Sequence, residues 1–504
     1  MSHLPPPDKA RPPTLLSRYR PSLALLTDLY QLTMAEGYWK QQLAEREAVF
    51  HLHFRRNPFG GGYALCAGLE DLMSWVERFH FASEDLTYLS SLENERGGPL
   101  FDRGFLDHLA SVRFTGQIDG IPEGRAVFPY EPLVRVQAPL LEAQLLETPL
   151  LTLINFPTLI ATKAARLATA AQGEPVLEFG LRRAQGIDGG LTASRSAYIG
   201  GCDATSNMLA GQLFGIPVRG THAHSWVMAF ENELEAFEAF AKAHPDNTLL
   251  LVDTYDTLQG VHRAIEVAKK LRAEGHRFLG IRLDSGDLAY LSHQSRQLLD
   301  AAGFADAAIV ASNELDELLI TDLKRQGAKV AIWGVGTSLA TGKGQSALDG
   351  VYKLSALRNE RGEWVDKIKL SEQMVKVTNP GLLQVRRYSH RESYVADLLY
   401  DIRQEPARGS WMVDPFDPTR QKRIDPEWEE EELLIPLFRH GQPVYHSPPL
   451  REIRQRAQRE LLRFHGSIKR FVYPHQYAVG MEQSLYEKKI ALIRKLRGTA
   501  MAPL

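Results

Sequence analysis

Cysteine is scarce in this chain, which also lacks long apolar runs and a large net charge. Only Cys66 and Cys202 occur among the 504 residues, which excludes a disulfide framework or a thiolate metal cluster and is typical of a reducing cytoplasm. The chain has no run of about 18 apolar residues, so we expect no membrane-spanning helix. Its 59 Lys and Arg nearly balance its 61 Asp and Glu, so neither a nucleic-acid partner nor a membrane-surface partner is indicated.

The length of the chain predicts more than one domain. Its first residues combine many prolines with scattered arginines and lack the apolar core of a signal peptide. The expected parts are, in order, a disordered leader (1–22), the first part of a split α+β domain (23–150), a catalytic α/β barrel (151–360), and the rest of the split domain with two terminal helices (361–504).

Short apolar runs alternate with helical patterns between about Pro175 and Leu357. This alternation predicts parallel strands that are buried on both faces and joined by helices. Seven such units favour an open or irregular barrel over a flat sheet. The expected strands are Val176–Leu181, Val218–His222, Leu249–Asp253, Phe278–Leu283, Ala308–Ser312, Val330–Gly334 and Val351–Leu354, and the expected helices are Glu233–Ala243, Val261–Glu274, Leu288–Ala302 and Glu314–Gln326.

Polar residues gather where these strands end, and in a barrel that rim is where the loops build the active site. The set offers an aromatic ring, cations, carboxylates, two histidines and glycine-rich turns, which indicates an enzyme that handles an anionic aromatic compound and phosphates. Its members are Phe179, Arg182, Arg183, Thr221, His222, His224, Ser225, Asp253, Asp256, Arg282, Asp284, Asp287, Ser312, Asn313, Glu314, Gly334, Gly336, Thr337 and Ser338.

His222 and His224 are two residues apart in an expected strand, so both imidazoles are predicted to share one face. A His-x-His pair at a strand end binds metal in several barrel hydrolases, although the later strand ends supply aspartates in place of further histidines. His222 is equally open to a structural role. His224, which lies between the small residues Ala223 and Ser225, is favoured as a functional residue.

Arg282 and Asp284 form a second candidate group at the end of one strand. An arginine captures a carboxylate or phosphate with two parallel hydrogen bonds, and a nearby carboxylate suits ribose hydroxyls or a Mg²⁺ ion carried by a diphosphate. A buried ion pair is the structural alternative. The turn from Gly334 through Gly336 to Thr337 permits close approach of an anion to the backbone, but it is weak evidence alone.

Taken in order, seven segments resemble the nicotinate phosphoribosyltransferase family. The resemblance implies a type II phosphoribosyltransferase fold, with an irregular α/β barrel and a split α+β domain, and a homodimer with shared active sites. It also implies that nicotinate and phosphoribosyl diphosphate form nicotinate mononucleotide and diphosphate, coupled to ATP hydrolysis through a phosphohistidine, with Mg²⁺ carried by the diphosphate. The segments are Thr27–Gln31, Phe54–Arg56, Glu178–Gly190, Gly220–Trp226, Arg282–Asp287, Gly334–Ser338 and Lys369–Gly381.

The same resemblance assigns roles to individual residues. His224 matches the phosphohistidine, and Asp253 matches a carboxylate that orients it. Asp203 matches a ring-proximal acid of the related nicotinamide enzyme, and an acid there would repel a carboxylate. The nicotinate-binding residues would be Tyr30 from a second subunit, Phe179, Arg182, Thr221, Ser225 and Arg282, and the phosphoribosyl- and phosphate-binding residues would be Arg55, Asp284, Ser312, Gly334, Gly336, Thr337, Lys376 and Thr378.

Two other functions are consistent with parts of the pattern. A metal-dependent barrel hydrolase would use His222 and His224 as ligands and would carry tightly bound zinc. A catalytically inactive nucleotide-sensing paralogue would bind phosphoribosyl diphosphate without turning it over. The combination of His224, Arg282, Asp284 and the glycine turn counts against that last possibility.

Overall fold

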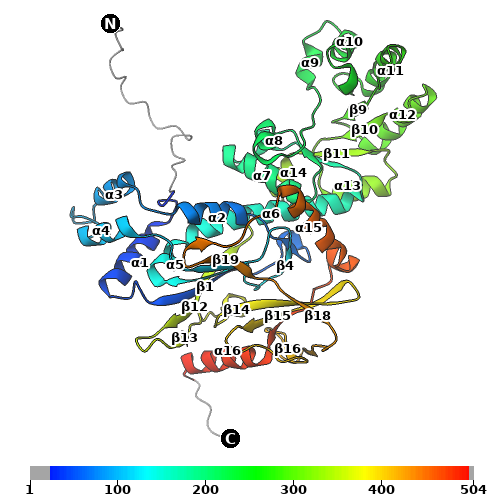
Figure 1. The fold of residues 1–504 in the computed structure, drawn as a ribbon. Helices are drawn as coiled ribbons and strands as arrows, with labels where there is room; N and C mark the ends of the chain where they lie inside the picture. Colours follow the sequence, from blue (N-terminus) through cyan, green and yellow to red (C-terminus); the bar gives the residue numbers. More distant parts are fainter. Residues whose placement is uncertain (1–22, 499–504) are drawn as a thin grey trace, which may run out of the picture.

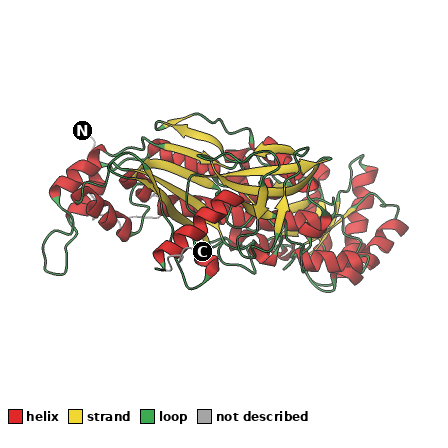
Figure 2. Ribbon diagram, turned by 90° about the horizontal axis from the view of Figure 1, so that it is seen from below, coloured by secondary structure: helices red, strands yellow, loops and turns green. Residues whose placement is uncertain are grey.

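The computed structural model describes residues 23–498, so the expected leader at 1–22 lies outside the described part. Figure 1 shows one part, drawn in green, that projects from a larger body built from both the N-terminal and the C-terminal segments. Figure 2 shows the strands gathered in the middle of the molecule, with helices at both ends. No helix of residues 23–498 has the length and apolar character needed to cross a membrane.

The projecting part contains a parallel sheet with the strand order β7-β6-β11-β10-β9-β8. Its core side chains, such as Leu250, Ile281 and Trp333, are fully buried, as expected for strands covered on both faces. The strands are β6 (Val176–Glu178), β7 (Ala204–Thr205), β8 (Leu249–Leu251), β9 (Gly280–Leu283), β10 (Ala308–Ala311) and β11 (Ile332–Val335).

Helices follow the strands of this sheet where their sequence pattern predicts them. Three of them begin with an aspartate, because the side chains of Asp256, Asp287 and Asp316 accept hydrogen bonds from backbone N–H groups of the first helical turn. The helices around the sheet are α6 (Glu147–Ala171), α7 (Gly186–Gly200), α8 (Met208–Phe214), α9 (His224–Met228), α10 (Glu233–Ala243), α11 (Thr257–Ala273), α12 (Leu288–Ala301), α13 (Glu317–Arg325) and α14 (Thr337–Ala340).

The expected strand Val218–His222 is wrong. Only Val218 forms an isolated parallel bridge, to Thr205 of β7, and farther along the segment a side chain replaces backbone pairing. The His222 imidazole accepts a hydrogen bond at Nε2 from the Leu251 N–H of β8, at 3.2 Å. This segment therefore contacts both edge strands of the parallel sheet and makes the barrel irregular.

The expected strand Val351–Leu354 exists, but its assignment to the parallel sheet is wrong. It lies within β12 (Gly350–Arg358), which pairs antiparallel with β1 (Glu47–Phe54). Only some of its residues are buried, whereas the strands of the parallel sheet are mostly buried. The polar residues Lys353 and Ser355 between its apolar ones are typical of a strand in an antiparallel sheet, and this signal distinguishes it from the six strands before it.

Two large sheets, mainly antiparallel, and the short antiparallel pair β2-β4 build the larger body and join segments far apart in the chain. One has the order β13-β12-β1-β5-β3-β19-β20, and the other, of mixed direction at β21, has the order β17-β16-β21-β15-β14-β18. The remaining strands are β2 (Ala64–Leu65), β3 (Gln117–Gly120), β4 (Ala126–Val127), β5 (Val134–Pro139), β13 (Trp364–Asp366), β14 (Leu383–His390), β15 (Ser393–Asp401), β16 (Trp411–Val413), β17 (Gln421–Arg423), β18 (Glu429–Glu432), β19 (Ile435–Arg439), β20 (Gln442–Pro443) and β21 (Val479–Glu482).

Helices cover these sheets, and the two terminal helices, expected near Leu450–Phe464 and Glu482–Arg497, are confirmed within two residues at each end. In Figure 1, α16 (red) lies beneath the sheet that contains β14, β15 and β16. The helices of the body are α1 (Leu29–Lys40), α2 (Leu69–Arg78), α3 (Ser83–Ser90), α4 (Arg103–Ser111), α5 (Leu140–Leu145), α15 (Leu450–Leu462) and α16 (Gln483–Leu496).

Candidate active site

Arg282, Asp284 and Ser312 meet at the carboxyl ends of β9 and β10. The Arg282 guanidinium donates from Nε to Ser312 Oγ at 2.7 Å and from Nη2 to Asp284 Oδ1 at 2.9 Å. The Ser312 hydroxyl also donates to Asp284 Oδ1, which closes a triangle of hydrogen bonds. Residues from two neighbouring strands therefore fix the direction in which the guanidinium points.

The Asp284 carboxyl is held in its charged form. Its partial burial alone would raise its pKa, but the hydrogen bond from Ser312 and the charge of Arg282 outweigh burial, so the pKa lies below its ordinary value. The rim thus presents a carboxylate and a guanidinium side by side, both fixed before any substrate binds.

Phe179 follows β6 directly, and its backbone N–H donates to Val335 O of β11 at 2.8 Å. The Arg282 guanidinium carbon lies 5.6 Å from the centre of its ring, within the range of a cation–π contact. A methyl group at Gly334 would come within 2.8 Å of the ring, so glycine is required there for the ring to lie against the backbone. The structure therefore brings together Phe179, Arg282 and Gly334 of the predicted set.

Glu178 supports this arrangement, although the sequence analysis assigns it no role. Its buried carboxylate accepts hydrogen bonds from the Gly180 N–H and from the hydroxyls of Ser194 and Thr205. These contacts fix the turn that carries Phe179. The sequence signal for Glu178 is an acidic residue at the end of an apolar strand.

His224 is the first residue of α9, and its side chain is 42% exposed. Its Nδ1 lies 3.2 Å from Thr254 Oγ1, and its Nε2 lies 3.8 Å from Asp284 Oδ2. The imidazole therefore reaches the group formed by Arg282 and Asp284, with one nitrogen engaged by a neutral hydroxyl. Thr254 follows the predicted residue Asp253 directly, but no sequence motif indicates a role for it.

His222 does not share this site. Its ring is buried with its centre 4.8 Å from that of Phe240, and its Nε2 already accepts the Leu251 N–H. Burial lowers its pKa to about 4, so the imidazole is neutral at pH 7. Residues 23–498 contain no group of three or more His, Cys, Asp or Glu placed to hold a metal ion, and Nε2 of His222 is occupied by a backbone donor. His222 is a structural residue, so the metal-dependent hydrolase hypothesis lacks its pair of histidine ligands.

Asp253 binds the turn after β9. Its Oδ2 accepts hydrogen bonds from the Asp284 N–H at 2.9 Å and the Ser285 hydroxyl at 2.6 Å. Its Oδ1 is buried and has no hydrogen-bond partner among the described residues. Within residues 23–498 the hydrogen-bond partner of His224 is Thr254, so the orienting role of Asp253 stays a prediction.

The other predicted rim residues lie after β6, after β11 or in the segment that leads into and begins α9. Thr221 Oγ1 lies 3.4 Å from Arg282 Nη1, and Thr337 Oγ1 donates to Glu314 at 3.1 Å. Their roles stay predictions. The remaining members are Ser225 in the first turn of α9, Arg182 in a short 3-10 helix after β6, and Gly336 before α14.

Asp203 lies at the opposite end of the parallel strands from Phe179. Its carboxylate accepts the N–H of Val176, the first residue of β6, and forms an ion pair with Arg454 of α15 at 2.7 Å. The side chain therefore ties α15 to the amino end of the sheet, away from the ring of Phe179.

Arg55, Lys376 and Thr378 form a second set, which we name the loop site. Arg55 follows β1, and Lys376 ends a short 3-10 helix, Met374–Lys376. Between them lies Tyr130, which donates from its hydroxyl to Val375 O at 3.2 Å. Burial raises the pKa of Tyr130, and the nearby charge of Arg55 opposes that change. No hydrogen bond or ion pair within residues 23–498 joins the loop site to the rim.

Tyr30 is also remote from the rim. Its side chain is 48% exposed on α1, and Figure 1 shows α1 at the opposite end of the molecule from β9 and β10. One chain by itself therefore does not bring Tyr30 to Phe179.

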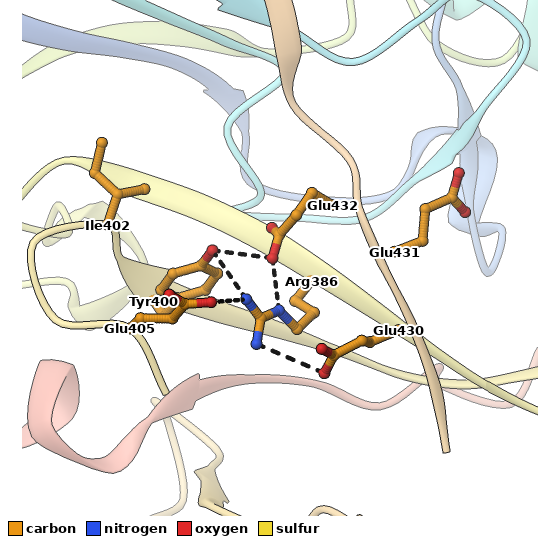
Figure 3. A pocket seen from close by; sticks show the side chains of 7 residues that line it. All are labelled: Arg386, Tyr400, Ile402, Glu405, Glu430, Glu431 and Glu432. Atoms are coloured by element: carbon orange, nitrogen blue, oxygen red, sulfur yellow. Dashed lines mark hydrogen bonds and ion pairs between the residues drawn. The ribbon is translucent and has the colours of Figure 1, made fainter. Parts of the chain in front are cut away.

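The described residues also line a cavity of about 350 Å³ around Arg386 of β14. Figure 3 shows its guanidinium facing Glu405 and Glu432, which accept at 2.9 and 2.6 Å, and Glu430, an ion-pair partner at 3.6 Å. Three carboxylates neutralise this arginine, so the cavity offers no free cation to an anionic substrate. We interpret it as a structural ion cluster.

The fold and the rim define a class of protein: an α/β protein with an arginine, a carboxylate and a histidine gathered at the carboxyl ends of its parallel strands. Models of the nicotinate phosphoribosyltransferase N-terminal domain, of the family itself and of its C-terminal domain match residues 25–155, 176–370 and 384–489. The chain belongs to the nicotinate phosphoribosyltransferase family, which confirms the resemblance seen in its sequence.

Individual relatives cover nearly the whole chain. A nicotinate phosphoribosyltransferase of Bacillus subtilis is 43% identical and covers 94% of this chain and 96% of its own. The human nicotinate phosphoribosyltransferase is 36% identical, covering 92% of this chain and 95% of its own. The crystal structure of human nicotinic acid phosphoribosyltransferase superposes with a TM-score of 0.80 at 34% identity, over 92% of this chain and 99% of that one, which confirms the predicted fold class.

Proposed function

We propose that this chain joins nicotinate to phosphoribosyl diphosphate, a step of NAD synthesis from nicotinate. The observation that carries this function is the guanidinium of Arg282 held beside the ring of Phe179. Nicotinate is a flat ring that bears a carboxylate, so it needs an aromatic surface and a fixed cation at this spacing. Family membership and the relatives described above support the same reaction.

The chemistry is a substitution at C1 of the ribose. The ring nitrogen of nicotinate forms a bond to C1, the bond from C1 to the diphosphate oxygen breaks, and diphosphate leaves with the electron pair. Positive charge develops on the sugar and negative charge on the leaving group, so catalysis rests on positioning and electrostatics. Asp284 would face the ribose, and its hydrogen bonds with Arg282 and Ser312 support this role.

We propose that ATP drives this reaction through His224. The γ-phosphoryl group would move to Nε2, with the bond to ADP breaking as the P–N bond forms, and water would later take the phosphoryl group from the imidazole. Two features support this role: the side chain is 42% exposed at the rim, and the hydroxyl of Thr254 can accept a hydrogen bond from Nδ1–H. That bond would leave Nε2 as the nucleophile.

Mg²⁺ fits the same rim. The buried Asp253 Oδ1 has no partner in the described part of the chain, and Mg²⁺ is commonly held by one or two carboxylates together with substrate phosphates. Asp253 and Asp284 would hold the ion, which would neutralise the charge of the diphosphate. Asp253 meanwhile keeps the Ser285 turn in place through Oδ2.

We propose a homodimer in which a second copy completes each site. Exposed apolar side chains on α1 include Leu29 at 54% and Met34 at 37%, and those on α8 include Met208 at 71% and Leu213 at 57%. Such surfaces mark protein interfaces. The second copy would supply Tyr30 to the ring of nicotinate and the loop site to the diphosphate. We further propose that the enzyme works in the cytoplasm.

The test is phosphate incorporation from γ-labelled ATP, measured together with nicotinate mononucleotide formation. We expect acid-labile label and coupled product in the wild type and in His262→Asn, a matched control for an exposed histidine on α11. His224→Asn should carry no label. Absence of product from nicotinate would contradict the transferase function and favour the inactive paralogue. Product without label would contradict only the phosphohistidine at His224.

A further inference from the structure

The loop of residues 374–381 carries both Lys376 and Thr378 of the loop site, and several contacts fix it in place. Tyr130 holds Val375 O at 3.2 Å, and Thr378 Oγ1 accepts the Lys369 N–H at 2.9 Å. Lys376 is exposed in the middle of this loop. The backbone on both sides of Lys376 is therefore anchored, while its ammonium remains accessible to an anion.

Two neighbouring lysines of α16 reach the far end of the same loop. Lys489 Nζ donates to Asn379 Oδ1 at 2.8 Å. Lys488 Nζ donates to Asp401 Oδ2 at 3.0 Å, and Gly381 packs so closely on that carboxylate that a methyl group there would clash with it. The C-terminal helix thus contacts the turn after Thr378 directly at Asn379, and Lys488 reaches the turn indirectly through Asp401.

Lys489 is an unusual residue to anchor this loop, because it is a buried cation. Only 4% of it is exposed, and its recorded partner in the described part of the chain is the neutral amide of Asn379. Burial lowers its pKa to about 8, so it is still mainly protonated at neutral pH. A buried cation that has no carboxylate partner lowers the stability of a protein. Its presence here therefore points to a role other than stability.

The surroundings of Lys489 are basic. Burial and the positive charges of Arg55, Lys353 and Lys489 together lower the pKa of His53 to about 3. Lys353 is paired with Glu147 at 3.4 Å. Within residues 23–498 neither Arg55 nor Lys489 forms an ion pair, so positive charge remains near the loop that carries Lys376, where an anion would be stabilised.

We propose that Lys489 is a positioning residue for phosphoribosyl diphosphate: its ammonium holds Asn379 and so fixes the loop that presents Lys376 to the diphosphate. This inference rests on the proposed function. It gives the C-terminal helix a part in substrate binding, although α16 lies on a different sheet from the rim.

The first test compares Lys489→Met with Lys495→Met in the full-length enzyme, by steady-state kinetics. Lys495 is an exposed lysine of the same helix, so its substitution is a matched control. For Lys489→Met we expect the KM for phosphoribosyl diphosphate to rise about tenfold, as for the loss of a charge-assisted hydrogen bond. The KM for nicotinate and kcat should stay within about twofold. Lys489→Arg, which keeps the charge and the donors, should recover most of the affinity.

The second test is a double-mutant cycle with Asn379→Ala. If Lys489 acts through Asn379, the double variant should have the same KM as either single variant, and additive effects would overturn the positioning role. A folded Lys489→Met with unchanged KM would also overturn it. If that variant does not fold by circular dichroism, an unchanged KM in Asn379→Ala decides against the inference. A wild type that forms no nicotinate mononucleotide would instead refute the proposed function.

Discussion

Removal of the Arg282 guanidinium is the most direct perturbation of the candidate site. In Arg282→Met, Asp284 and Ser312 lose bonds of 2.9 and 2.7 Å, and the cation beside Phe179 disappears. Loss of a charge-assisted bond to the nicotinate carboxylate costs about 1.5–3 kcal/mol, and the disturbed Asp284 adds about 1 kcal/mol. The sum predicts a fall in kcat/KM of about 10²–10³.

The assay is steady-state formation of nicotinate mononucleotide, with nicotinate varied at saturating phosphoribosyl diphosphate. Arg282→Lys keeps the charge but loses the planar fork, so we expect an intermediate fall. Arg325→Met, on the surface of α13 with that side chain 78% exposed, is the control and should be unchanged. A folded Arg282→Met whose kcat/KM falls less than about threefold would refute the reasoning.

Three further predictions concern other parts of the structure. Gly334→Ala should displace the ring of Phe179 and raise the KM for nicotinate without changing the melting temperature, and an unchanged KM contradicts the close packing. Arg387→Met should lower the free energy of unfolding by about 3–5 kcal/mol in urea titrations, because it leaves the buried Asp397 unpaired; a change under about 1 kcal/mol argues against this ion pair. His222 has a folded pKa of about 4, below its ordinary value of 6.5, so its contribution to stability is complete above pH 6.5 and is lost as pH falls towards 4. Unfolding at several pH values should show a flatter profile for His222→Gln than for the wild type.

Short-range patterns predicted the helices and most of the parallel strands correctly. The helix Glu233–Ala243 agrees with the prediction at both ends, and Asp256 and Asp287, which the sequence analysis counted among rim residues, begin α11 and α12 as caps. Apolar periodicity and caps depend on neighbouring residues alone, so the sequence contains this information. The two strand errors involve pairing partners, which depend on distant segments.

The candidate site also combines contacts that the sequence predicts with contacts that only the packing of distant segments decides. Arg282 and Asp284 share a face because they are two apart on one strand, and that was predictable. The third member of the triangle, Ser312, comes from the next strand, and Thr254 beside His224 comes from another loop. The family resemblance predicts Ser312 as a phosphate ligand, and no sequence pattern predicts a role for Thr254, because the hydrogen-bond partners of both residues are set by the sheet.

Residue types and their order along the chain were enough to indicate the family, the α/β class and a rim with an arginine, a carboxylate and a histidine. Tertiary structure decided which histidine is free: both belong to the same segment, but His222 turns into the sheet to accept the Leu251 N–H while His224 starts a helix at the rim. It also decided that Lys489 of α16 donates a hydrogen bond to Asn379 in the loop that carries Lys376. The reason is physical, because hydrogen bonds between residues distant in sequence depend on how strands and helices pack, and local patterns carry no record of that packing.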